Sequence, residues 1–256
     1  MLSIEELVNQ VKEETLSCVI KKNRELVDMK YNDFESNVTF GRTFSLGQWF
    51  GYFLGLEVAK ILNDHQVLID TCLTTKKQYP TKSNPDNKRR KSYYPDILIV
   101  KKITDDTSSY EEYIKENKRT ITKHNLPLDP KNINLFEAQA IIELKIDPGY
   151  IDTNDLRVSF AKLNEYLNAN EEFSFKKIYS KQDEEDEFYI KNIVRFNSEK
   201  VMKSLVLATE ANHPERIEEI KRVCKDEQFD FISLTSSSKH IRDYKISDLP
   251  DLENLI

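Results

Sequence analysis

Two apolar segments of the sequence carry ionisable residues at places where a buried strand would be expected. Asp96 stands directly before the apolar run 97–100, and Glu143 and Lys145 stand inside the run AIIELKI. An ionised carboxylate beside a core strand is costly unless a cation or several hydrogen-bond donors meet it. These two segments are therefore the first places to look for chemistry.

Strand geometry suggests how these residues could meet. Side chains alternate along a strand, so Glu143 and Lys145 share one face and Leu144 faces the other way. If this strand pairs with the one that begins at Asp96, both acids and the lysine can converge at one end of a sheet. Two carboxylates that close repel each other unless a divalent cation lies between them, and oxygen ligands favour magnesium or manganese over zinc. We therefore predict a metal site in which Lys145 reaches a metal-bound water or a scissile phosphate.

Helix-capping patterns and the periodicity of apolar residues predict the helices and strands that would position these residues. Capping-box patterns at 3–6 and 45–48 predict the starts of two helices, the second running to about residue 62. Continuous apolar runs predict strands, and a helical stripe or a first-turn proline predicts further helices. The strands are expected over 66–73, 93–100, 138–146, 204–209 and 229–234, and the further helices over 153–167 and from Pro214. This order predicts an α/β fold, with a mixed sheet and helices on both faces.

Pro95 and Asp96, followed by Glu143, Leu144 and Lys145, resemble the signature of the PD-(D/E)XK nuclease superfamily. The expected order of elements is similar to the common core of that family. The resemblance implies a restriction-endonuclease-like fold, in which a mixed central sheet is flanked by helices. It also implies that Asp96, Glu143 and the backbone carbonyl of Leu144 bind magnesium, while Lys145 orients or activates the attacking water.

Two further features bear on this resemblance. Many members of the family present an acid from the preceding helix, and Glu57 matches that place, on a helical stripe with Phe50. The separation between Asp96 and Glu143 exceeds the compact family pattern, which predicts an insertion between their strands, here 103–136. The alternative to a metal site is a buried Glu–Lys pair at a sheet end, with Asp96 capping a turn.

A basic segment with interleaved tyrosines, 75–94, lies between two of the expected core strands. Such a concentration of positive charge is informative in a chain whose formal net charge is −6. We interpret the segment as a flexible loop that grips nucleic-acid phosphates; a solvated loop that is merely basic is the alternative. The residues expected to contact DNA are Lys76, Lys77, Lys82, Lys88, Arg89, Arg90 and Lys91.

Glycines recur every four residues in the second helix, at Gly47, Gly51 and Gly55. Each interior glycine costs a helix roughly 1 kcal/mol relative to alanine, so the close approach of another backbone is the expected gain. A core strand is the expected neighbour, and a second subunit is the alternative.

Composition limits the class of protein. A hydrophobic content of 39% with 10% aromatic residues is typical of a folded globule, and the acidic balance argues against a chain coated with nucleic acid over its whole surface. Three widely spaced cysteines predict reduced thiols in a cytoplasmic protein. The sequence suggests no signal peptide, no membrane span and no phosphate-binding glycine loop, hence no nucleotide cofactor. The four histidines are scattered and are expected at the surface or at helix caps.

Together these features predict one nuclease domain over 1–256, with a helical extension (1–44), a catalytic core (45–235) that contains the insertion, and a tail (236–256). The expected activity is that of a metal-dependent phosphodiesterase, a DNA endonuclease that uses magnesium, with manganese as a substitute. By analogy it is most like a type II restriction enzyme, a class that usually acts as homodimers. The alternatives are a structure-specific repair nuclease or junction resolvase, a catalytically inactive nucleic-acid-binding module of the same fold, and an RNA-directed nuclease.

Overall fold

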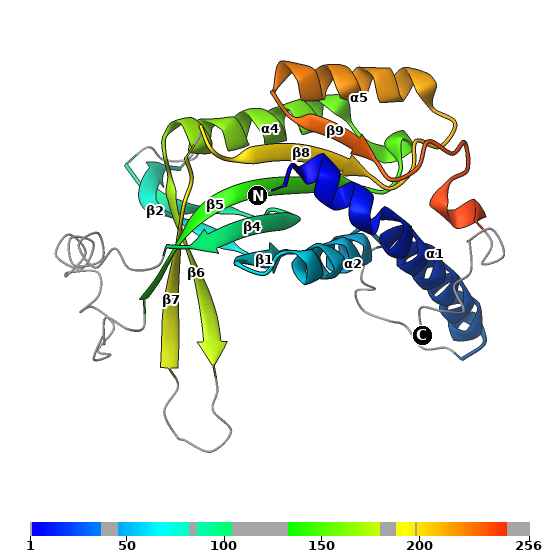
Figure 1. Cartoon of the computed structure of the whole chain (residues 1–256), viewed down its shortest axis with the longest axis horizontal. Coiled ribbons are helices and arrows are strands. Elements are labelled where there is room, and N and C mark those ends of the chain that lie inside the picture. Colours follow the sequence, from blue (N-terminus) through cyan, green and yellow to red (C-terminus); the bar gives the residue numbers. More distant parts are fainter. Residues whose placement is uncertain are drawn as a thin grey trace.

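The protein has a mixed α/β fold, built on a mixed sheet with helices on both faces (Figure 1). The structure is a computed structural model that describes residues 2–36, 46–81, 86–103, 133–179, 188–197 and 199–244. Its elements in chain order are α1 (Ile4–Ser36), α2 (Leu46–Ile61), β1 (His65–Ile69), β2 (Leu73–Pro80), β3 (Lys88–Tyr93), β4 (Ile97–Lys102), β5 (Ile133–Lys145), η2 (Pro148–Tyr150), α4 (Thr153–Asn168), β6 (Glu172–Tyr179), β7 (Phe188–Arg195), β8 (Met202–Leu207), α5 (Pro214–Asp226), β9 (Asp230–Ser233) and η3 (Ile241–Asp243).

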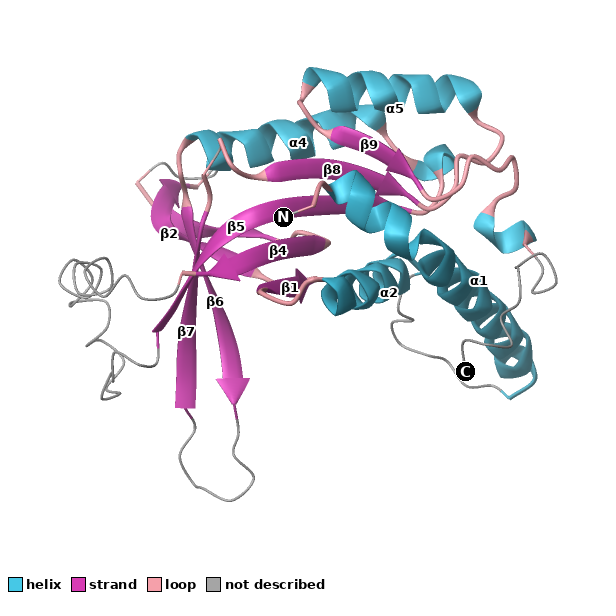
Figure 2. Cartoon of the chain, in the orientation of Figure 1, coloured by secondary structure: helices cyan, strands magenta, loops and turns pink. Residues whose placement is uncertain are grey.

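Strand β5 is the point at which the sheet divides (Figure 2). On one side it pairs antiparallel with β4, which in turn pairs antiparallel with β1. On the other side its first half runs parallel to β7, whereas its second half runs parallel to β8 and is followed by β9. The arm that begins at β7 continues through β6 and β2 to β3. The end of β5 therefore lies between β4 and β8, away from this arm.

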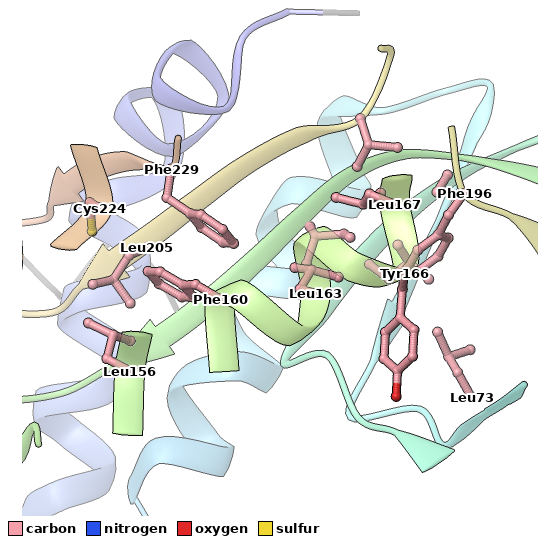
Figure 3. Close-up of a cluster of buried hydrophobic side chains, with 14 of the residues drawn as sticks. Leu73, Leu156, Phe160, Leu163, Tyr166, Leu167, Phe196, Leu205, Cys224 and Phe229 are labelled. Carbon is pink, nitrogen blue, oxygen red and sulfur yellow. The ribbon is translucent and has the colours of Figure 1, made fainter. Parts of the chain in front are cut away.

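The apolar runs in β4 and β5 are continuous because helices cover both faces of the sheet there. Leu98 and Val100 point into a core cluster beneath α4 and α5, while Ile97 and Ile99 point into a second cluster beneath α1 and α2. In the first cluster the rings of Phe160 and Phe229 stack with centroids 3.7 Å apart (Figure 3). The result is a three-layer arrangement in which the buried residues of β4 alternate between the two clusters.

The glycines of α2 allow this helix to lie close to the sheet. A β-carbon at Gly51 would be 3.3 Å from Leu144 Cδ1, and one at Gly55 would be only 2.6 Å from Ile69 Cδ1. The neighbours of these two glycines are therefore core strands, as expected, but side chains of the strands approach the helix where a backbone was predicted. At the start of α1 the side chain of Glu6 accepts hydrogen bonds from Ser3, so the first capping box is formed.

The basic segment differs from the sequence-based expectation. Most of it forms the hairpin β2–β3, where a flexible loop was expected, because β2 also pairs with β6 and is held within the sheet. The strand expected over 66–73 is interrupted at Asp70, whose φ is 44° and which directly follows the last residue of β1. The hairpin β6–β7 was not predicted at all.

Two other boundaries also change. The last residues of the expected insertion belong to β5, which begins at Ile133, and 104–132 lie outside the described residues. The expected tail contains η3, and Ile241 and Tyr244 are buried beneath α1. Among the described residues, the helices are all too short or too polar to cross a membrane.

Candidate active site

The sheet brings Asp96, Glu143 and Lys145 to one face. Asp96 precedes β4 and lies in phase with Leu98, whereas Glu143 and Lys145 lie in phase with Ile141 in β5, and both Leu98 and Ile141 belong to the cluster beneath α4. All three residues are intermediate in burial, neither fully exposed nor fully enclosed. The convergence follows from the antiparallel register, in which Ile97 is opposite Ile142.

Asp96 is held in place by backbone hydrogen bonds. Its Oδ2 accepts the N–H of Leu144 at 2.7 Å, and its carbonyl oxygen accepts the N–H of Asp70 at 3.0 Å. The side chain of Asp96 thus extends the β4–β5 ladder beyond Ile97, where β4 begins. This contact ties the carboxylate to the segment that carries Glu143 and Lys145.

Tyr93 supplies a hydrogen bond to the second acid. Its hydroxyl donates to Glu143 Oε1 at 3.0 Å. The Tyr93 ring packs near the rings of Tyr166, Phe173 and Phe196, with centroids 6.1, 6.2 and 6.4 Å away. Burial, followed by the charge of Glu143, raises the pKa of the Tyr93 hydroxyl well above its usual value, so this residue acts as a fixed donor.

The two carboxyl groups are too close for both to ionise easily. Burial is the largest cause that raises the pKa of Glu143, to about 7, and the charge of Asp96 is the second. Burial also raises the pKa of Asp96, whereas Lys145 and the N–H of Leu144 lower it. The charge of Asp96 thus opposes ionisation of Glu143, and Lys145 offsets only part of the negative charge that the two acids would carry together.

The donor set fits a hard divalent cation. Asp96 and Glu143 offer carboxylate oxygens, which magnesium and manganese prefer. In a strand the N–H and C=O of one residue point to the same edge. Because the N–H of Leu144 faces Asp96, while the carbonyl of Lys145 accepts from Ala208 on the other side, the Leu144 carbonyl faces the Asp96 edge. These three oxygens are the predicted ligand set.

Glu57 is not brought to this cluster. It lies on α2, which covers the opposite face of β5, the face to which Leu144 points. Its carboxylate forms an ion pair with Lys60 at 2.7 Å, one turn along the helix, and lies near Cys18 of α1. An amphipathic stripe showed that Glu57 faces inward, but it could not show which face of the sheet α2 covers.

Two residues of the cluster were missed by sequence reasoning. Tyr93 is the last residue of β3, and Asp70 directly follows β1. The Asp70 N–H donates to the Asp96 carbonyl oxygen, and the charge of Asp70 raises the pKa of Asp96. A sequence signal for Asp70 did exist, because this acid follows the apolar run VLI just as Asp96 precedes another. Its role becomes visible only once β1 and β4 are known to pair.

The basic residues lie along the hairpin that ends at Tyr93. Lys88, Arg89 and Arg90 are exposed on β3, whereas Lys91 is partly buried with its ammonium 4.2 Å from the ring centroid of Tyr79. On β2, Lys77 is exposed and Lys76 forms an ion pair with Glu172 at 3.0 Å. Lys82 lies outside the described residues.

Comparisons with family models, with curated proteins and with solved structures found no match for this chain. Its function must therefore be inferred from the site itself.

Proposed function

We propose that this protein is a magnesium-dependent DNA endonuclease with a restriction-endonuclease-like fold, most like a type II restriction enzyme. The observation that carries the proposal is the convergence of Asp96, Glu143 and Lys145 on one sheet face, around the backbone of Leu144. These are the residues that match the PD-(D/E)XK signature. The sequence signature and the hydrogen bond between Asp96 and the Leu144 N–H thus point to the same site.

The order of elements gives further support. The core runs through α2, β1, β4, β5, α4, β8, α5 and β9, which is a helix, three strands, a helix, a strand, a helix and a strand. The first three strands form an antiparallel meander, and α4 connects β5 to the parallel strand β8. The hairpins β2–β3 and β6–β7 are inserted into this order, and the former leads directly to Asp96.

The chemistry of phosphodiester hydrolysis suits this site. When bound by Asp96, Glu143 and the Leu144 carbonyl, magnesium would lower the pKa of a water molecule and neutralise charge on the phosphate. Lys145 would provide an ammonium on the same face, able to orient the attacking water or to contact the phosphate. Tyr93 holds the Glu143 carboxylate by donating to one of its oxygens.

The hairpin β2–β3 is the proposed DNA contact. Arg89 and Arg90 project from an exposed strand whose last residue, Tyr93, belongs to the acid cluster. Phosphate contacts from such a strand would place the backbone of DNA relative to the acids without reading sequence.

Incubation with DNA and magnesium, followed by mapping of the cut ends, tests the proposal. We expect Mg²⁺ or Mn²⁺ to support cleavage and chelation to abolish it. Lys145→Ala should lower the rate by at least about 10²–10³, the scale seen when one charge-stabilising donor is removed. The matched control is Lys101→Ala, since Lys101 lies in the neighbouring strand β4 and pairs with Asp64 at the surface.

The substrate panel should contain plasmid, linear duplex, branched DNA and RNA. Fixed cut sites in plasmid would support the restriction-enzyme assignment, whereas cleavage of branched DNA alone would indicate a junction resolvase or repair nuclease. Normal DNA binding without cleavage of any substrate would contradict the enzymatic proposal and favour an inactive binding module.

A further inference from the structure

We propose that Asp147, His213 and His240 form a second metal site, selective for a zinc-type divalent cation. Each residue offers one ligand atom, and these atoms all lie within 4.8 Å of one another. The sequence predicted scattered histidines, but the fold brings two of them to the same carboxylate. The nuclease proposal is not needed for this inference, because no residue is shared between the two sites.

The three residues come from separate segments that meet beyond the end of β5. Asp147 follows β5 and is 7% exposed, His213 immediately precedes α5, and His240 immediately precedes η3. Asp147 Oδ1 accepts the N–H of Gly149 at 2.9 Å, and its Oδ2 contacts His240 Nδ1. The two imidazole rings lie edge to face with centroids 5.4 Å apart. The carboxylate is therefore oriented by the backbone and directed toward the histidines.

This ligand set differs from that of the acid cluster. Two imidazole nitrogens and one carboxylate oxygen suit zinc, cobalt and similar ions, whereas magnesium prefers oxygen ligands alone. With metal–ligand distances of about 2.0–2.1 Å, the ligand atoms of a tetrahedral site are about 3.4 Å apart. Side-chain rotations of Asp147, His213 and His240 would close the remaining gap. Three protein ligands leave a fourth position for water or an exchangeable ligand.

Gly149 provides space beside the ligands. A β-carbon at this position would be 3.0 Å from His213 Nε2 and 3.2 Å from Asp147 Oδ1. The backbone of Gly149 does not have a positive φ, so its conformation is open to other residues. A substitution at Gly149 would therefore act mainly by crowding the ligands.

A bound ion would fasten the segment before η3 to the end of β5 and the start of α5. This segment is already attached by Thr209, whose hydroxyl donates to the carbonyl of Lys239 at 2.9 Å, and by the burial of Ile241 and Tyr244. An ion that binds only the folded chain stabilises it by mass action. Without an ion, the same residues would form only an Asp147–His240 pair with His213 beside it.

Titration of chelator-treated protein with Zn²⁺, followed by calorimetry, tests the site. We expect one equivalent to bind and to raise the melting temperature, and Co²⁺ to give the visible absorption of a low-symmetry nitrogen–oxygen site. His213→Ala and His240→Ala should each weaken Zn²⁺ binding by at least about 100-fold, since even partners outside the ligand set contribute 10–100-fold. His65→Ala removes a histidine elsewhere and should leave the affinity unchanged.

Gly149→Ala keeps all three ligand side chains and should still weaken binding, by about 10-fold, comparable to the loss of a residue that orients a ligand. Asp96→Asn shows whether the ion instead occupies the acid cluster, and the zinc affinity of this variant should equal that of the wild type. Failure of the wild type to bind Zn²⁺ would overturn the proposal. So would binding that is retained in both histidine variants, and circular dichroism of the metal-free variants separates loss of a ligand from loss of the fold.

Discussion

Two clusters of ionisable side chains lie near the end of β5, and they differ in both composition and origin. The acid cluster contains Asp96, Glu143 and Lys145, with Tyr93 as a hydrogen-bond donor. The histidine cluster contains Asp147, His213 and His240. The first gathers carboxylates and is proposed to hold a hard cation, whereas the second gathers imidazoles and is proposed to hold a softer one. The two proposed sites would thus place different metal preferences close together in the fold.

The difference lies in how each cluster compensates its charge. In the acid cluster the two carboxyl groups raise each other's cost of ionisation, and burial raises the pKa of Glu143 to about 7. In the histidine cluster one buried carboxylate lies beside two imidazole rings. A divalent cation would therefore stabilise the acid cluster more than the histidine cluster. Its binding would release any proton that the two acids hold.

Crossed substitutions give the largest expected effect. Asp96→Asn keeps an acceptor for the Leu144 N–H but removes a ligand charge, so it should abolish cleavage and weaken Mn²⁺ binding by about 100-fold or more. Its zinc affinity should not change. His240→Ala should show the opposite pattern in metal binding, as measured by electron paramagnetic resonance for Mn²⁺ and calorimetry for Zn²⁺. If either variant lost both affinities, the two clusters would not be independent sites.

Glu143→Gln tests the electrostatic side of the comparison. The folded-state pKa of Glu143 is raised, from 4.5 to about 7, so ionisation opposes folding and wild-type stability falls as pH rises through this interval. The variant should therefore be more stable than the wild type above about pH 7, by on the order of 3 kcal/mol, and little different below about pH 4.5. Added Mg²⁺ should narrow the gap.

Urea unfolding at the two ends of this pH interval measures the effect of Glu143→Gln. Glu137→Gln is the matched control, because Glu137 lies on the same strand but pairs with Lys200 near the surface. If the variant and the wild type differed in stability by the same amount at both pH values, the pKa of Glu143 would not be raised in the folded protein.

Arg89→Gln combined with Arg90→Gln tests whether DNA approaches the acid cluster along β3. We expect about 10-fold weaker DNA binding at moderate salt and a salt dependence shallower by about 2, one for each lost phosphate contact. The paired control is Arg216→Gln with Lys221→Gln, which removes the same charge from α5, where both residues pair with glutamates. Equal losses in the two double variants would indicate a general charge effect. Anisotropy titrations at several salt concentrations provide the measurement.

Glu57→Gln should have the smallest effect. It removes an ion pair with Lys60, and pairs of this kind on a helix contribute about 0.3–0.5 kcal/mol. We expect nearly normal cleavage, since α2 covers the opposite face of β5 from Glu143. A loss of cleavage comparable to that of Asp96→Asn would show that the helix acid reaches the metal in the DNA complex.

Particular elements show how far the sequence could be interpreted. Helices α4 and α5 begin where the sequence predicts them, whereas β4 begins four residues after the expected start at 93 and β5 begins five residues before the expected start at 138. The sequence predicts a loop where the hairpin β2–β3 forms, because its lysines and arginines resemble a solvated segment and only the pairing with β6 makes it part of the sheet. The sequence does not predict the hairpin β6–β7, because polar and charged residues interrupt the apolar residues of both strands, so neither contains the long apolar run that marks the core strands.

By itself the sequence determined that Asp96, Glu143 and Lys145 could share a face, because side-chain alternation in two buried strands is a local property. Only the tertiary structure decided which other groups join them. The strand order places Asp70 and Tyr93 at the acids, the packing of α2 takes Glu57 to the other face, and the chain path beyond β8 brings His213 and His240 to Asp147. These groups come together because segments far apart in the chain pair, and the local spacing of residues does not predict which segments pair.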